Sequence, residues 1–147
     1  HQTNSELLKC ACGYTNYENF MIKLEELNKH KYPTTPEIDA NLMILLERIN
    51  SIRLAYNKPM VVTSGLRSQE QQQQLIATGK SNAPKSKHLL GQACDILDKN
   101  GELWEWCMNN MSLIEHIGLW LEDKSATPTW VHFQTVPPKS GNRIFKP

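Results

Sequence analysis

The sequence predicts an α+β fold, in which helices pack on a small, largely antiparallel sheet. Two segments with apolar residues at helical spacing precede Lys58, and short β-branched segments mostly follow them. Strands and helices do not alternate regularly, as they would in a parallel α/β fold. At 147 residues the chain has the length of one domain.

Two amphipathic helices are predicted first. Over residues 17–30, apolar side chains recur at steps of four and three residues, up to the break at Pro33. A longer helix should begin near Thr34 or Thr35, with Pro36 in its first turn, and should end at Asn57. Its apolar stripe comprises Ile38, Leu42, Leu45, Ile49, Ile52 and Tyr56. This stripe indicates core packing and no function of its own.

A strand, a turn and a third helix should follow. Residues 60–63 have the β-branched character of a short buried strand. Arg67 then lies on the turn into a helix, because Ser68 and Gln71 form a capping-box start for a helix that reaches about Thr78. The glutamines at 71–74 are expected to form a solvated helix face without chemistry.

Residues 79–87 are polar, contain Gly and Pro, and predict a surface loop of a length that often carries function. Residues 92–97, 117–122 and 129–134 predict strands, and 101–111 predict a helix rich in Trp and Met. We therefore expect one domain over residues 1–147. Its parts would be N-terminal helices at about 17–57, a core at about 60–134 and an irregular tail at 135–147.

Composition excludes several classes of partner. The 16 basic residues nearly balance the 15 acidic ones, so no strong field favours nucleic acid or anionic lipid. No apolar run is long enough to predict a membrane span, and the N-terminal segment lacks the pattern of a secretion signal. We expect a monomer that binds neither nucleic acid nor membrane.

The four cysteines are expected to be reduced thiols. Cys10, Cys12, Cys94 and Cys107 lack the density of a disulfide-stapled domain. The Cys10-x-Cys12 pair has no second Cys or His pair at the spacing of a structural zinc site.

The segment from His88 to Asp95 is the most informative part of the chain. Side chains alternate along a strand, so Asp95 faces one side and its immediate neighbours face the other. Gly91 lies between His88 and this strand and permits a tight turn, which would return the imidazole of His88 to the carboxylate of Asp95.

A second imidazole comes from residues 129–134, where Trp130, His132 and Gln134 share one face. Two neutral imidazoles and one carboxylate, with a fourth position left to water, are a ligand set that zinc accepts in catalytic sites. We therefore predict Zn²⁺ held by His88, Asp95 and His132, although such ligands also admit manganese, cobalt or nickel. Trp130 is a candidate to line the adjacent cleft.

These residues also carry a family resemblance. Ser86-x-His88-x-x-Gly91-x-Ala93-x-Asp95, with a later strand ending Trp130-Val131-His132, resembles the M15 group of zinc D,D-peptidases. Ser64-Gly65-Leu66-Arg67-Ser68 is similar to the Ser-Gly-Tyr-Arg-Ser turn of that group, with Leu66 in place of the aromatic residue. The blocks run from about residue 60 to 134 in the family's order, within what the resemblance implies is a single peptidase domain.

The M15 group includes D-Ala-D-Ala carboxypeptidases and dipeptidases, phage endolysins and the structurally related Hedgehog domain. The resemblance therefore implies a Hedgehog-like fold and a zinc metallopeptidase that cuts stem peptides or cross-links of peptidoglycan. Zinc would polarise the scissile carbonyl and lower the pKa of its bound water toward neutrality. Arg67 would hold a substrate carboxylate or the developing oxyanion with its planar donor fork. Ser86 would brace the metal loop or donate to substrate, and Trp130 would contact substrate.

The general base is where the sequence departs from much of the family. Many members carry Asp or Glu three residues before the last histidine, but this chain has Thr129 there, which does no acid-base work at neutral pH. One branch takes its acid from the preceding strand, with Glu closing a Leu-x-x-Glu pattern. We therefore assign Glu122 as the base, with Asp123 as the fallback.

Two rival hypotheses remain. Thr129 motivates a zinc-stabilised cell-wall-binding module with the same fold and no turnover. A phage component that grips the wall without cutting it is the third possibility. In each case we expect the protein to act at the bacterial cell wall. It would be cytoplasmic until lysis, carried in a virion, or secreted with a removed signal, and the sequence leaves a host or a phage origin open.

Overall fold

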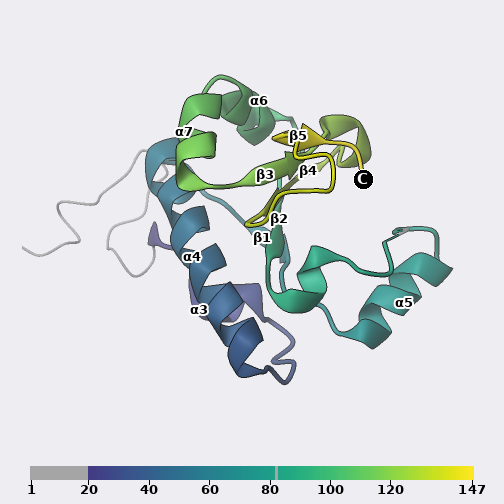
Figure 1. The fold of residues 1–147 in the computed structure, drawn as a ribbon. Coiled ribbons are helices and arrows are strands. Elements are labelled where there is room, and N and C mark those ends of the chain that lie inside the picture. The colour runs from purple at the N-terminus through teal and green to yellow at the C-terminus, as the bar shows by residue number, and fades with distance from the viewer. Residues whose placement is uncertain (1–19, 82) are drawn as a thin grey trace, which may run out of the picture.

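The computed structural model describes residues 20–81 and 83–147, and its centre is a five-stranded sheet with the order β1-β2-β4-β3-β5 (Figure 1). The strands are β1 (Val62–Ser64), β2 (Ala93–Leu97), β3 (Trp120–Glu122), β4 (Trp130–Gln134) and β5 (Ile144–Phe145). The first three pairings along this order are antiparallel, whereas β3 and β5 pair in parallel. The predicted α+β fold with a small, largely antiparallel sheet is confirmed.

Helix α4 (Pro36–Tyr56) provides one wall of the core. Thr35 caps it, since its hydroxyl accepts the Ile38 N–H at 3.2 Å, and Asn57 ends it in the left-handed conformation. The predicted stripe is largely buried, and Leu42, Leu45, Ile49 and Ile52 join one core cluster with side chains of β1 to β4. Burying each such side chain contributes roughly 1.5–3 kcal/mol.

The first predicted helix is much shorter than the expected residues 17–30. Within residues 21–30 the α-helix is α3 (Leu24–Leu27), and residues 17–19 lie outside the described part of the chain. Ile22 is held by tertiary contacts instead. Its backbone N–H donates to Asn50 Oδ1 at 2.8 Å, and its carbonyl accepts from Asn50 Nδ2 at 2.9 Å. Backbone groups bonded to α4 in this way cannot continue a helix.

The predicted helix over 101–111 is divided in two. Helix α6 covers Glu102–Met108 and α7 covers Met111–Ile117, so the strand expected at 117–122 begins only at Trp120. Asn110 lies between them with its side chain donating to the Trp106 carbonyl at 2.8 Å. Gly118, with φ +94°, ends α7 before β3 begins. Asn side chains that bond to nearby backbone compete with a continuous helix.

The tail is less irregular than predicted. Residues 144–145 form strand β5, which pairs in parallel with β3 and places Phe145 against the ring of His132 at 6.2 Å between centroids. This pairing carries the end of the chain back to the face of the sheet that holds the histidine.

Helix α5 (Gln69–Ala77) and the segment after it lie beyond one end of the sheet, and α6 and α7 lie toward the other end (Figure 1). Two 3₁₀ helices complete the described structure, η1 (Lys87–Leu90) and η2 (Lys124–Ala126). Among the described helices, none combines the length and hydropathy needed to cross a membrane. Cys94 and Cys107 are free and buried, whereas Cys10 and Cys12 lie outside the described residues.

Candidate metal centre and substrate pocket

His88 is positioned by η1 and by the turn after β1. The Ser86 hydroxyl accepts the backbone N–H of His88 at 3.2 Å, which caps η1 and braces the loop. The Nδ1 atom of the buried His88 ring lies 2.8 Å from the Gly65 carbonyl, which can only accept, so Nδ1 carries the proton. In the neutral ring, the lone pair of Nε2 therefore faces the opposite way, toward Asp95.

Gly65 can hold this carbonyl in place because the backbone is crowded there. A Cβ at residue 65 would lie 2.3 Å from the Leu27 carbonyl oxygen, which is far inside van der Waals contact. The adjacent backbone N–H groups of Leu66 and Arg67 donate to the carbonyls of Leu27 and His88, at 2.7 and 3.1 Å. Glycine is required here for close approach of two chain segments.

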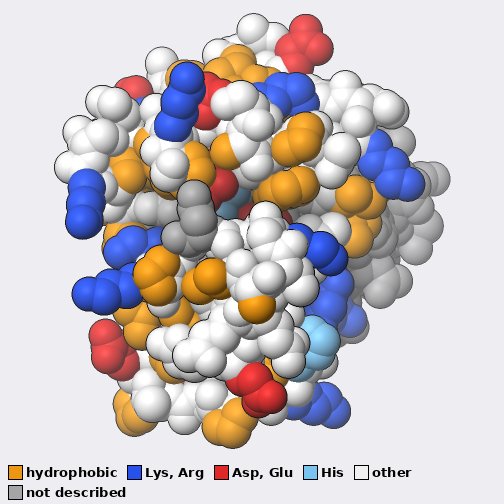
Figure 2. All heavy atoms as spheres, turned by 90° about the vertical axis from the view of Figure 1, so that its right-hand side faces the viewer, with side chains coloured by type: hydrophobic (Ala, Val, Ile, Leu, Met, Phe, Trp, Pro, Cys, Tyr) orange, Lys and Arg blue, Asp and Glu red, His pale blue; other side chains and the backbone are white. Residues whose placement is uncertain are grey.

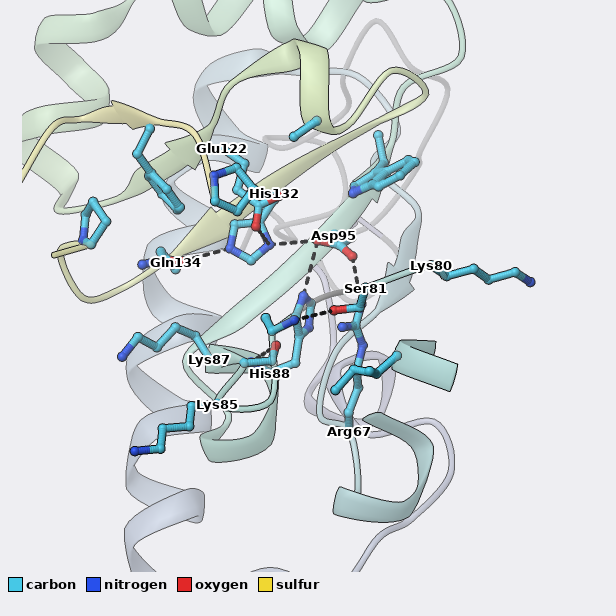
Figure 3. Close-up of a pocket in the computed structure, with 18 of the residues that line it drawn as sticks. Arg67, Lys80, Ser81, Lys85, Lys87, His88, Asp95, Glu122, His132 and Gln134 are labelled. Carbon is cyan, nitrogen blue, oxygen red and sulfur yellow. Dashed lines mark hydrogen bonds and ion pairs between the residues drawn. The ribbon is translucent and has the colours of Figure 1, made fainter. Parts of the chain in front are cut away.

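Asp95 and His132 lie opposite each other on the neighbouring strands β2 and β4. They are direct partners in the antiparallel register of β2 and β4, in which opposing side chains lie close together. The Oδ1 atom of Asp95 lies 3.0 Å from His132 Nδ1 and 3.3 Å from His88 Nε2. Figure 3 shows the two imidazoles and the carboxylate turned toward one another.

The second ring nitrogen of His132 is held by Gln134, which follows it on the same face of β4. His132 Nε2 lies 2.8 Å from Gln134 Oε1, and Gln134 Nε2 donates to the Val136 carbonyl at 2.8 Å. Because the amide nitrogen is committed to Val136, the amide oxygen must accept from His132. In the neutral ring, the proton of His132 therefore lies on Nε2 and the lone pair of Nδ1 faces Asp95, whereas a protonated ring donates from Nδ1 to Asp95.

Arg67 holds the other oxygen of Asp95. Its guanidinium donates from NH2 to Asp95 Oδ2 at 3.3 Å and from Nε to Ser64 Oγ at 3.0 Å. A third donation runs from NH1 to Gln72 Oε1 at 3.1 Å. Of the five N–H donors of a guanidinium, two remain for a substrate. Arg67 therefore makes a contact that was not predicted. Because this contact uses Asp95 Oδ2, Asp95 Oδ1 is left available to a metal.

Gln72 corrects the expectation for the glutamine run. We predicted that residues 71–74 form a solvated face, but the Gln72 side chain is fully buried. Its amide nitrogen donates to Ser81 Oγ at 3.0 Å and to the Ala83 carbonyl at 2.7 Å, while its oxygen accepts from Arg67. Gln72 therefore connects Arg67 to the loop that follows α5. Gln73 and Gln74 are exposed, as predicted.

The electrostatics of the site favour a cation at the point that the three side chains of His88, Asp95 and His132 share. Burial alone would raise the pKa of Asp95, but the charge of His88 and the hydrogen bonds from both imidazoles outweigh it and hold the pKa well below its usual range. Burial likewise would lower the pKa of His132, but the hydrogen bond and the charge of Asp95 outweigh it and raise the pKa. A divalent metal would compete with a proton for the His132 Nδ1 lone pair.

The three side chains fit a zinc ion. Each residue offers one ligand atom, and the three atoms lie within 4.8 Å of one another at buried positions. Ligand atoms about 2.0–2.1 Å from a tetrahedral zinc are themselves about 3.3–3.4 Å apart. The distances of 3.0 and 3.3 Å to Asp95 Oδ1 agree with this spacing. The second polar atom of each ligand is bonded to Gly65, Arg67 or Gln134, as outer-shell contacts of metal ligands commonly are.

Glu122 and Asp123, the two candidate bases, differ sharply in their surroundings. Glu122 lines the pocket at the metal centre, and its Oε1 lies 3.8 Å from His132 Nδ1. Asp123 instead caps η2, where its Oδ1 accepts from the backbone N–H and the hydroxyl of Ser125 at 3.0 and 2.6 Å. These hydrogen bonds lower the pKa of Asp123. Thr129 is exposed and, like Asp123, is outside the pocket lining.

The pocket beside these residues has a volume of about 740 Å³. Ser86 and Trp130, both predicted to contact substrate, line it together with Arg67 and Gln134. Figure 2 shows the corresponding face, with histidine and acidic side chains at the floor of a hollow. The strand pairing of β5 also brings Phe145 into the lining.

Sequence reasoning did not assign roles to Gly65 or Gln72, and it considered Gln134 only as a residue that could line the substrate cleft. Gln134 had a usable signal, because it follows His132 by two residues on a strand and so shares its face. Gln72 had none, since four consecutive glutamines are equivalent until the helix is oriented.

The chain was compared with known proteins. A sequence model described as peptidase M15 matches residues 19–119, a range that includes Arg67, His88 and Asp95 and ends before Glu122 and His132. Among solved structures, the chain is similar to the L-Ala D-Glu endopeptidase ChiX of Serratia marcescens. The sequences are 23% identical, and the match covers 75% of this chain and 95% of that chain with a TM-score of 0.49. No match was found among curated proteins.

Proposed function

Since the chain belongs to the peptidase M15 family, we propose that it is a zinc-dependent hydrolase of peptide bonds in peptidoglycan. The observation that carries the proposal is the convergence of His88 Nε2, Asp95 Oδ1 and His132 Nδ1 on one buried point. The second polar atom of each side chain is engaged by the protein, so all three are oriented before a metal binds.

Zinc bound by these residues would supply Lewis-acid chemistry, polarising the scissile carbonyl and acidifying a water molecule. The three protein ligands leave room for a fourth partner, as in catalytic zinc sites. Other divalent ions fit the same nitrogen and oxygen donors, so the identity of the metal belongs to the proposal.

Glu122 is proposed as the general base. It is a carboxylate in the pocket wall with a fifth of its side chain exposed, so solvent and substrate reach it. It would take a proton from the attacking water and return it to the leaving amine. Asp123 is the cap of η2 and lies outside the pocket lining, which supports Glu122 over the fallback.

Arg67 is proposed to use its two remaining N–H donors on the substrate, either on a carboxylate or on the oxygen of the scissile carbonyl. Its contact with Asp95 Oδ2 ties this donor pair to the metal ligands. Ser86 and Trp130 would contact the peptide from the pocket wall. A pocket of about 740 Å³ is large enough for several residues of a peptide.

The substrate class rests on the family resemblance of the motifs around His88 and His132. We propose stem peptides or cross-links of peptidoglycan as substrates, cut by carboxypeptidase or endopeptidase action at the bacterial cell wall. A phage-encoded enzyme released at lysis is the setting that we propose for this activity.

The test is hydrolysis of purified peptidoglycan by the zinc-loaded protein, with released fragments identified by mass. A chelated sample and the His132→Ala variant serve as controls, and both should release nothing. Chelator-sensitive release would support the peptidase and identify the bond. Tight zinc binding without release from several wall chemistries would favour the non-catalytic wall-binding module.

A further inference from the structure

The segment that follows α5 is strongly basic within a nearly neutral chain. Residues 79–88 contain Lys80, Lys85 and Lys87 and no acidic residue, although the whole chain has 16 basic and 15 acidic residues. The three lysines all line the pocket at the metal centre. We call them the lysine rim.

The lysine rim is available to a ligand. Within residues 20–81 and 83–147, none of the three ammonium groups forms an ion pair. Lys80 and Lys85 are exposed, and Lys87 is half-buried. In Figure 3 Lys80 extends to one side of the centre, and Lys85 and Lys87 extend to the other. Their charges therefore flank the metal ligands at the pocket mouth instead of entering the centre.

The acidic side chains of the pocket do not cancel this charge. Only Asp95 and Glu122 are acidic among its described lining residues. Asp95 is paired with Arg67 and lies between the two imidazoles, and Glu122 lies beside His132. A divalent metal at the three ligands would add further positive charge. A cleft lined by one sign of charge raises the local concentration of oppositely charged substrate.

We propose that the lysine rim binds free carboxylates on the residues that flank the scissile bond, so that the substrate is an acidic peptide with more than one free carboxyl group. This inference deepens the proposed peptidase function and rests on it. Peptides in which these carboxyl groups are amidated bind more weakly, because the three ammonium groups would then have no negative charge to attract.

The flanking position of the rim determines what it contributes. Contacts remote from the reacting carbonyl act in the ground state and the transition state alike, so they change substrate affinity more than turnover. Contacts between exposed charges are also screened by salt. The preference for free carboxyl groups should therefore weaken as ionic strength rises.

The test compares two synthetic stem peptides that are identical except that the side-chain carboxyl groups are free in one and amidated in the other. Their Kd values are measured by calorimetry on the zinc-loaded Glu122→Gln variant, which prevents turnover, and their hydrolysis is measured on the unmodified protein. The free-acid peptide should bind about five- to tenfold more tightly at low salt, the sum expected from a few exposed charge contacts.

Two matched triple variants locate the effect, each in the Glu122→Gln background. Replacing the rim, as Lys80→Gln, Lys85→Gln and Lys87→Gln, should bring the ratio of the two Kd values close to one. Replacing Lys31, Lys99 and Lys139 by Gln removes the same charge from exposed positions outside the pocket lining and should preserve the ratio.

The outcomes separate the two proposals. Hydrolysis of both peptides with equal Kd values, or an equal loss of preference in both triple variants, would overturn the lysine rim and leave the peptidase intact. Preferential binding of the free-acid peptide without hydrolysis by the unmodified protein would support the rim and count against the peptidase.

Discussion

The side-chain amide of Gln134 determines which nitrogen of His132 faces Asp95. Gln134 Oε1 lies 2.8 Å from His132 Nε2, and Gln134 Nε2 is committed to the Val136 carbonyl at 2.8 Å. Rotation of the amide would break the second bond and place two donors against each other. When the ring of His132 is neutral, Gln134 thus selects the tautomer with the proton on Nε2.

Replacing Gln134 by Leu should weaken zinc binding by about 10- to 100-fold, the usual effect of removing such a supporting contact. Gln134→Glu is the matched variant, since it retains an oxygen that accepts from His132 Nε2. It should retain most of the affinity. Competition with a chelating dye measures the zinc affinity of both variants. Equal zinc affinity in the Leu variant and the unmodified protein would contradict this role.

Gly65→Ala should impair both folding and the metal site. The added Cβ would lie 2.3 Å from the Leu27 carbonyl oxygen, so the backbone of residue 65 must move, and its carbonyl supports His88 Nδ1 at 2.8 Å. We expect a loss of roughly 1–3 kcal/mol in the free energy of unfolding, as for other overpacked sites. Denaturant unfolding and zinc titration check this. A variant with unchanged zinc affinity would show that the Gly65 carbonyl does not position His88.

Glu122→Gln should retain zinc and lose at least about 100-fold in kcat, which is the lower range for loss of a general base. Asp123→Asn is its control, because Asp123 bonds to Ser125 at the start of η2 and lies outside the pocket lining. That variant should keep kcat within about twofold while losing some stability, as for other helix caps. For each variant, kcat is measured at saturating peptide, and the content of bound zinc is measured on the same sample. Full activity of Glu122→Gln would overturn the assignment of the base.

Gln72→Ala should lower kcat/KM by more than the accompanying loss of stability explains. The variant leaves a guanidinium N–H of Arg67 and the partners at Ser81 and Ala83 without their buried amide, at a cost of about 1–3 kcal/mol. Gln73→Ala, exposed on the same helix, should change neither quantity. Measuring kcat/KM well below the melting temperature, on protein of verified zinc content, separates a loss of Arg67 positioning from a loss of folded protein. Unchanged kinetics in a destabilised Gln72→Ala variant would assign Gln72 a purely structural role.

The buried thiols should be inert in the folded protein. Burial and the charge of Asp98 raise the pKa of Cys107 to about 12, and burial also raises the pKa of Cys94. The reactive thiolate is therefore scarce at neutral pH. With Cys10 and Cys12 replaced by Ser, an alkylating reagent at pH 8 should modify neither thiol until denaturant is added. Rapid modification of the native variant would contradict their burial.

Much of this molecule was predictable from local patterns. The period of the apolar residues in α4 and its Thr35 cap predicted the longest helix to within a residue or two, because both signals act within one turn of the chain. The motifs around Arg67, His88 and Asp95 predicted the family, which is confirmed by the match over residues 19–119. The alternation along β4 predicted that His132 and Gln134 share a face.

Non-local contacts explain the failures. Ile22 bonds to Asn50 across a large part of the chain, which replaces the first predicted helix with a short one, and β5 pairs with β3 although η2 and β4 lie between them in the sequence. Neither contact has a local signature, because each depends on the path that the rest of the chain takes. The same reason hid the role of Gln72, whose orientation is set by its contacts with Arg67 and with the loop that follows α5.

The sequence by itself determined the kinds of side chain available and their order, since imidazole, carboxylate and guanidinium chemistry and strand alternation are local properties. It therefore identified His88, Asp95 and His132 as candidates before any fold was known. Only the tertiary structure decided which atom of each faces the shared point, how Arg67 divides its donors, and that Glu122 and not Asp123 enters the pocket. Those choices depend on hydrogen bonds to Gly65, Gln72, Gln134 and Ser125, which form only when distant segments pack together.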